Sequence, residues 1–143
     1  MSTGLSIAVA VIFIWLGMVA AISFLEAPLK FRAPNVTLQI GLGIGRLVFR
    51  ALNSVEVVFA IVILAGFLAS PPSVGAIVAF GIAFAALIVQ LVGVRPWLNR
   101  RSDKVLAGLN APRSRGHYAY VGFEAIKVIA LAVAGILLLS SQR

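Results

Sequence analysis

The chain has 143 residues, of which 62% are hydrophobic and 11% are charged, and it carries a net charge of +8. This balance excludes an ordinary soluble domain, in which about 25% of the residues are charged. Most basic residues lie at two connections between apolar segments, which is typical of membrane topology, so we expect no nucleic-acid partner. The absence of cysteine excludes disulfides and thiolate catalysis.

Four apolar segments are long enough to cross the hydrocarbon core of a bilayer, which takes about 20 helical residues. They are residues 5–25, 47–68, 74–94 and 118–139. Only helices and closed barrels satisfy their backbone groups in lipid, and these runs do not alternate, so we predict helices. The predicted fold is all-α: an integral membrane four-helix bundle of two transmembrane hairpins, in a single domain over residues 1–143.

The first segment, residues 5–25, has no basic region before it and is longer than the apolar part of an ordinary secretion signal, so we expect it to remain attached. In the first connection, residues 26–46, apolar residues alternate with glycine or polar residues. A lone strand would leave backbone groups unpaired, so we predict a helical start to the second segment, with Gly41 and Gly45 spaced for the close approach of another helix. A backbone cradle for a phosphate beside Arg46 is the alternative.

The second and third segments are joined by a tight turn at Pro71 and Pro72. The third connection, residues 95–117, contains a predicted short surface helix that is capped by Ser102 and ends near Gly108.

The distribution of positive charge predicts how the chain crosses the membrane. Both long connections are rich in Lys and Arg, whereas residues 69–73 and the residues before the first segment carry no charged side chain. Because cytoplasmic loops are enriched in basic residues, we expect both connections in the cytoplasm and both termini outside, in a bacterial cytoplasmic (inner) membrane. Basic rims also attract anionic headgroups, so membrane lipids are expected partners.

Two of the apolar segments carry polar residues at helical spacing. These residues are Arg46, Arg50, Asn53 and Glu56 in the second segment, and Tyr120, Glu124 and Lys127 in the fourth. Residues three and four positions apart share one face of a helix, and both helices run outward from the cytoplasm. We therefore predict that Glu56 and Lys127 lie at similar depth and pair, since a lone charge near the bilayer centre costs on the order of 3 kcal/mol.

Each segment contributes at least one polar residue to the cytoplasmic half, whereas the outer half is almost wholly apolar. This asymmetry predicts a pocket, open to the cytoplasm or inner leaflet, that binds or transports a small polar or amphiphilic ligand. We expect Glu56 and Lys127 at its floor, and Arg50 and Glu124 at the polar group of the ligand. The candidate binding residues are Glu26, Arg46, Arg50, Asn53, Glu56, Gln90, Arg95, Asn99, Tyr120, Glu124 and Lys127.

Two other functions fit the same residues. Buried ion pairs can fix helix packing without a ligand, so a structural or assembly subunit of a larger membrane complex is one alternative. A lipid-modifying enzyme with Glu124 as acid or base is the other, although the sequence favours a protein that is not an enzyme. Carboxylate-bridged metal sites need Glu-x-x-His ligands, which are missing here, so we expect neither metal nor cofactor. Transport by so small a chain would favour a homodimer.

Three short motifs resemble those of a known membrane protein family. They are Trp15-Leu16-Gly17, then Phe24, Pro28 and Phe31, then Gly45-Arg46-Leu47-Val48-Phe49-Arg50. This set, mainly in the first half of the chain, is similar to the small four-helix membrane proteins typified by transmembrane protein 205, with their bacterial relatives. The resemblance implies a helical bundle and a loose association with metal-drug resistance. The chain departs from metal-export chemistry because it has no Cys, one His and two Met.

Overall fold

The computed structural model describes residues 1–108 and 115–141, which form helices and the connections between them. Several helical elements follow one another without a break and make up long, irregular rods. The elements are α1 (Thr3–Val19), the π-helix η1 (Ala20–Glu26), α2 (Ala27–Leu29), the 3-10 helix η2 (Lys30–Arg32), α3 (Leu38–Ala69), α4 (Val74–Val89), the π-helix η3 (Gln90–Val94), α5 (Arg95–Leu106) and α6 (Arg115–Ser140).

Four of these rods in the described part of the chain are long and apolar enough to cross a membrane. They cover Thr3–Arg32, Leu38–Ala69, Val74–Leu106 and Tyr118–Ser140. The rods bear out the predicted all-helical bundle and indicate a multi-pass membrane protein. Helix also covers residues 26–32 and 95–106, which the apolar pattern places in connections, because a helix satisfies its own backbone on either side of a membrane surface.

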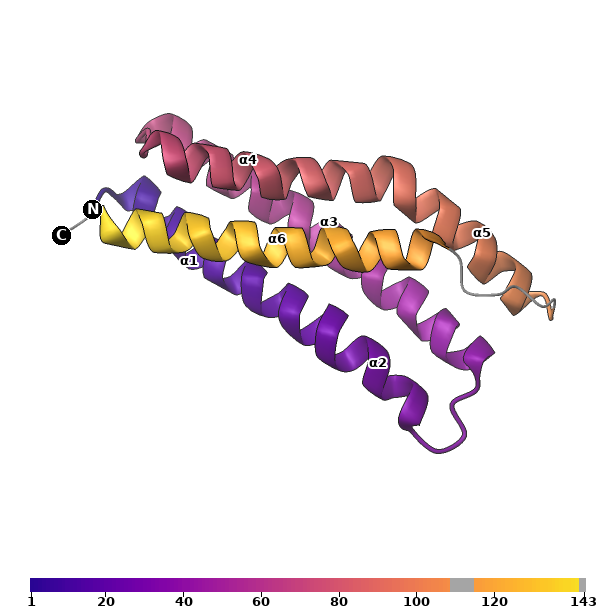
Figure 1. Ribbon diagram of the computed structural model, residues 1–143. Coiled ribbons are helices and arrows are strands. Elements are labelled where there is room, and N and C mark those ends of the chain that lie inside the picture. Colours follow the sequence, from indigo (N-terminus) through magenta and orange to yellow (C-terminus); the bar gives the residue numbers. More distant parts are fainter. Residues whose placement is uncertain (109–114, 142–143) are drawn as a thin grey trace.

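The four rods form a bundle in which α1 packs against both α3 and α6, and α6 packs against α4. By comparison, α3 and α4 make little contact with each other, and α3 and α6 face each other diagonally. Figure 1 shows that the rods lie close together where α1 begins and α6 ends, and that α2 and α5 diverge at the opposite end. The site described below lies between the tight end and the divergent end.

The tight end of the bundle is closed by small and aliphatic residues. A Cβ placed on Gly66 of α3 would lie 2.6 Å from the carbonyl oxygen of Gly4 in α1, so the two backbones touch here. Small residues at a helix interface allow this approach in membrane proteins. Farther in, the buried side chains of Ile12, Ile63 and Leu131 fill the centre. This packing leaves the polar residues on the other half of the bundle.

Both halves of the chain contain a π-helix shortly before a proline. The π-helix η1 ends two residues before Pro28, and η3 ends two residues before Pro96. Proline has no N–H and its ring clashes with the preceding turn, so the helix before it departs from regular α geometry. The two prolines are 68 positions apart, as are Glu56 and Glu124. Each half therefore pairs an irregular rod with a helix that carries a buried glutamate.

The glycine-rich start of α3 is helical, as predicted. The Thr37 hydroxyl caps it by accepting a hydrogen bond from the Ile40 N–H at 3.1 Å. A Cβ on Gly41 would lie 2.2 Å from the Phe31 ring, so glycine is what allows η2 to approach α3. The Gly41 N–H bonds to the Thr37 carbonyl at 2.9 Å and cannot contribute to the phosphate cradle of the alternative interpretation.

The short helix predicted after Ser102 is part of the longer α5. Ser102 lies inside α5 and does not cap it, because α5 begins at Arg95 as the direct continuation of η3. The predicted end is confirmed: α5 stops at Leu106, and Gly108 follows with a φ of +85°, which favours glycine. Residues 109–114 of this connection lie outside the described residues.

Candidate functional site

Three ionisable side chains meet in the middle of the bundle, and we name them the buried triad: Glu56 of α3 with Glu124 and Lys127 of α6. Lys127 Nζ lies 2.5 Å from Glu56 Oε2 and 2.5 Å from Glu124 Oε1. At most 1% of each of the three side chains is exposed. These distances are typical of charge-assisted hydrogen bonds, so one ammonium bridges two carboxyl groups. The predicted pairing of Glu56 with Lys127 is confirmed.

Helix geometry explains how the triad is assembled. Glu124 and Lys127 are three positions apart and therefore neighbours on one face of α6. Glu56 reaches them from α3, which faces α6 diagonally. The side chains of Glu56 and Lys127 are long enough to meet in the centre of the bundle, although α3 and α6 are not direct neighbours.

Neutral donors complete the surroundings of both carboxyl groups. The Trp15 indole N–H donates to Glu56 Oε2 at 2.7 Å. Gln90 of η3 donates its amide N–H to Glu124 Oε1 at 2.8 Å, and the Ser23 hydroxyl of η1 donates to Glu124 Oε2. All four rods thus contribute to the network, two of them through their π-helices, which frequently occur at functional sites. Glu56 Oε1 is buried and has no hydrogen-bond partner among the described residues.

A second polar layer connects the triad to the divergent end of the bundle. The Tyr120 hydroxyl donates to Asn53 Oδ1 at 3.4 Å, and the Gln90 amide also bonds to the Tyr120 carbonyl at 3.2 Å. The Tyr120 ring meets Phe49 edge to face, with centroids 5.5 Å apart. Asn53 and Tyr120 are both buried. This layer continues the polar network from the triad toward the space between the diverging rods.

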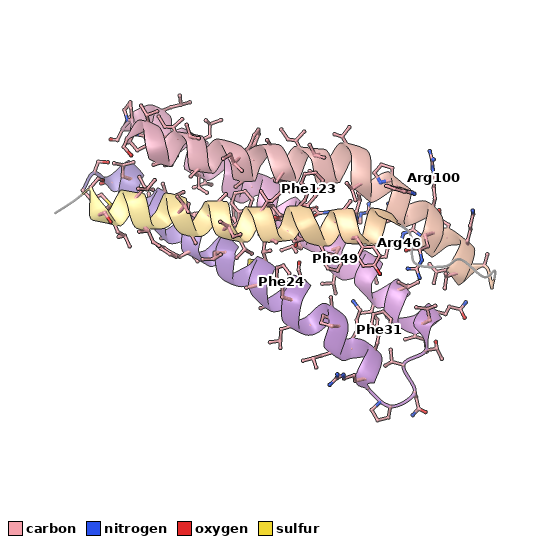
Figure 2. The ribbon with its side chains drawn as sticks, in the orientation of Figure 1. Phe24, Phe31, Arg46, Phe49, Arg100 and Phe123 are labelled. Atoms are coloured by element: carbon pink, nitrogen blue, oxygen red, sulfur yellow. The ribbon has the colours of Figure 1, made fainter. Side chains whose placement is uncertain are left out.

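That space is a cleft of about 380 Å³, which we name the central cleft. Its apolar lining includes Phe24, Phe31 and Phe49, and these three side chains are labelled in Figure 2 near the divergence of α2 and α3. Of the triad, only Glu124 lines the cleft. The cleft is therefore an aromatic-walled hollow with one buried carboxyl group at its inner end.

The central cleft is strongly basic, with Lys30, Arg46, Arg95 and Arg101 lining it in addition to Glu124. Lys30 Nζ lies 5.8 Å from the centre of the Phe49 ring, and the Arg95 guanidinium carbon lies 5.7 Å from it. Two cations thus stack against one aromatic ring, an arrangement that attraction between cation and ring stabilises. A Cβ on Gly45 would lie 2.8 Å from Lys30 Nζ, so this glycine makes room for the ammonium.

A second hollow of about 600 Å³ lies between α3 and the rod formed by η3 and α5, and we name it the side groove. Arg46, Arg95 and Asn99 line both hollows. Arg95 donates to the Arg46 carbonyl at 3.2 Å, and the Arg46 guanidinium pairs with Asp103. These residues form a partition between the side groove and the central cleft.

The structure separates the predicted site residues into distinct places. Arg50 lines the side groove and Glu124 the central cleft, so the two do not share a cavity as expected. The reason is that residues spaced three positions apart do not lie directly above one another on a helix. At about 100° per residue, Arg50 and Glu56 lie about 120° apart around α3. Their roles as ligand contacts stay predictions. Of the other predicted residues, Arg46, Arg95 and Asn99 line both hollows, whereas Asn53 lines only the side groove and Tyr120 only the central cleft. Glu56, Gln90 and Lys127 are buried and line neither hollow. Glu26 also lines neither hollow and lies 3.8 Å from Lys30.

Sequence reasoning missed two residues of the network. Trp15 belongs to none of the polar stripes, although a buried indole N–H needs an acceptor and Glu56 is the acceptor found. Ser23 is a small polar residue in an apolar run and gives no periodic signal. Lys30, interpreted as a topology signal, is also a lining residue of the central cleft.

Comparisons of the chain with protein-family models, curated proteins and solved structures found no match. Among the described residues, no group of three or more His, Cys, Asp or Glu side chains is arranged to hold a metal ion.

Proposed function

We propose that the protein binds or transports a small polar or amphiphilic ligand through the central cleft. The observation that carries this proposal is the cleft itself, which has aromatic walls and four cations and ends at Glu124 of the buried triad. Small-molecule sites are typically concave and mostly apolar, with a few placed polar groups. The excess of cations favours a ligand that combines an anionic group with an apolar part.

The proposed setting is a bacterial cytoplasmic membrane, with both termini outside and the cleft open to the cytoplasm or the inner leaflet. The described basic residues of both long connections support it, because they gather at the divergent end of the bundle (Figure 1), whereas residues 69–73 carry no charge. The start of α1 and the end of α6 lie together at the opposite end (Figure 1). Ligand would then enter from the side where positive charge attracts anionic headgroups.

The similarity to the transmembrane protein 205 family is part of this proposal. Its motif residues serve the site: Trp15 bonds to Glu56, while Phe31 and Phe49 line the central cleft. A homodimer is proposed as the transporting form, since a four-helix chain seldom encloses a complete alternating-access pathway.

A structural subunit of a membrane complex is the second candidate, and one observation favours it. The three side chains of the triad contact one another through Lys127, and at most 1% of each is exposed. Pairs of this kind can fix the packing of helices without any ligand. The two candidates differ in what the cations of the central cleft contribute, because a structural subunit does not need them.

The experiment that tests the proposal compares Arg95→Met with Arg100→Met. Arg95 lines the cleft, whereas Arg100 is exposed on α5 and lines neither hollow (Figure 2). The proteins are placed in nanodiscs of neutral lipid and titrated with dodecyl phosphate in a calorimeter. A hydrogen bond to a charged group contributes about 1.5–3 kcal/mol, so Arg95→Met should weaken binding about tenfold or more. Lys30→Met, a second cleft variant, should also weaken it.

Arg100→Met is the matched control and should bind like the wild type. Equal affinity of the wild type and both cleft variants, or no binding by any of them, would favour the structural subunit over the ligand-binding protein.

A further inference from the structure

Two carboxyl groups and one ammonium group are enclosed together at the centre of the bundle. Glu56 and Glu124 both contact Lys127, and at most 1% of each side chain is exposed. With both carboxyl groups ionised, the triad would hold one negative charge that its single ammonium leaves uncompensated. The remaining hydrogen-bond donors to the two carboxyl groups, Trp15, Ser23 and Gln90, are neutral. An uncompensated charge is expensive in the interior of a membrane protein.

Among the described residues, the elements packed around the triad place no second cation in contact with its carboxyl groups, and Arg95 acts on Glu124 only at longer range. Neither α1 nor α4 contains a charged residue. On α3 the nearest cation along the chain is Arg50, which lines the side groove. On α6 the neighbouring Tyr120 hydroxyl bonds to Asn53. Arg95, at the start of α5, bonds to the Arg46 carbonyl. Among the described residues, only Lys127 forms an ion pair with either carboxyl group of the triad.

Hydrogen bonding distinguishes the two carboxyl groups. Glu124 accepts from three donors, with Lys127 and Gln90 on Oε1 and Ser23 on Oε2. Glu56 accepts from Trp15 and Lys127, both on Oε2, and its Oε1 has no partner among the described residues. A protonated carboxyl oxygen is itself a donor and cannot face another donor. Glu56 Oε1 is thus the one oxygen of the triad that can take a proton while every hydrogen bond among the described residues keeps its direction, whereas on Glu124 Oε2 the Ser23 hydroxyl would have to turn and accept.

We infer that the buried triad binds one exchangeable proton, carried by Glu56 Oε1. A proton from water forms the O–H bond there, and the triad becomes neutral: a carboxylic acid at Glu56, a carboxylate at Glu124 and an ammonium at Lys127. The unpaired hydroxyl costs less than an uncompensated charge at this depth. Ionisable residues inside membrane bundles form the proton sites of pumps and transporters, and this site does not depend on what the central cleft binds.

Infrared spectroscopy of the protein in lipid counts protonated carboxyl groups through their carbonyl stretching bands, which shift in heavy water. At neutral pH the wild type should show one such buried group. Glu56→Gln should remove it, and Glu124→Gln should also remove it, because Glu56 then pairs with Lys127 as a carboxylate. Lys127→Met should raise the count to two. Glu26→Gln, outside the network, is the matched control and should keep one.

Three results would overturn the inference: a wild type with no protonated buried carboxyl group, a wild type with two, or a band that survives in Glu56→Gln or in Glu124→Gln.

A second measurement, the emission of Trp15, leaves the triad intact. Trp97 is 46% exposed, and Trp97→Phe leaves Trp15 as the single indole of the chain. Because Trp15 donates to Glu56, its emission should change with pH in this variant and stay constant once Glu56→Gln is added. A constant emission in Trp97→Phe alone would contradict an exchangeable proton on Glu56.

Discussion

Replacing Lys127 with Met should show how strongly the buried triad stabilises the fold. The ammonium is fully buried and lies 2.5 Å from both Glu56 Oε2 and Glu124 Oε1. Removing one partner of a buried ion pair costs about 3–5 kcal/mol, because the remaining charge loses its compensation. Lys127 serves two carboxyl groups, so we expect a loss of about 5 kcal/mol in the free energy of unfolding at neutral pH.

The loss should depend on pH in a defined direction. Without the ammonium, the folded variant must keep both carboxyl groups protonated, whereas the unfolded chain releases these protons. The folded state then binds more protons than the unfolded state, so the free energy of unfolding falls as the pH rises and recovers in acid. Reversible unfolding in mixed micelles with increasing dodecyl sulfate, followed by tryptophan emission at several pH values, measures both quantities.

The matched control removes all three charges together. In the triple variant Lys127→Met, Glu56→Gln and Glu124→Gln no carboxylate is left without a partner, and replacing a complete buried ion pair by neutral groups is often close to neutral in stability. We expect this variant to unfold within about 1.5 kcal/mol of the wild type. A Lys127→Met variant that loses less than about 1 kcal/mol, or a loss that does not change with pH, would refute the reasoning.

Two further substitutions test the packing around the triad in the same unfolding assay. Trp15→Phe removes the indole donor that lies 2.7 Å from Glu56 Oε2, and should cost about 0.5–1.5 kcal/mol, the net contribution of a hydrogen bond to a neutral carboxyl group; an unchanged stability would remove Trp15 from the network. Gly66→Ala places a Cβ 2.6 Å from the Gly4 carbonyl oxygen, and overpacking of this kind costs about 1–3 kcal/mol. Gly81→Ala, with nothing within 4 Å of its Cβ, should have little effect, and equal losses in the two glycine variants would contradict the close approach at Gly66.

The apolar runs predicted the helices well but not their ends. Length and hydrophobicity identify where a chain can cross a membrane, but they do not show whether the chain stays helical beyond the membrane surface. Residues 26–32 and 95–106 remain helical because the wider π-helical turns before Pro28 and Pro96 accommodate the proline rings within continuous rods. The π-helices before both prolines have no signature in the apolar pattern.

Helical spacing predicted the pair of Glu56 and Lys127, since both lie at the same depth on polar stripes. The same spacing places Glu124 one turn from Lys127, yet its membership of the triad depends on side-chain rotamers that periodicity does not specify. Trp15 and Ser23 contact the carboxyl groups across 41 and 101 positions of sequence, and such contacts follow only from the packing of the rods. Arg50 lines the side groove and not the central cleft, because the stripe of polar residues turns around α3.

A structure of the protein bound in a lipid nanodisc tests the central claim most directly. If the cleft is a ligand site, density for a bound amphiphile should lie against Phe31 and Phe49, with its anionic end near Arg95, and the side chain of Glu124 should remain at the inner end. A cleft closed by the packing of α2 and α5 onto α6, with no density between them, would contradict the account and leave the buried triad as a structural feature of the bundle.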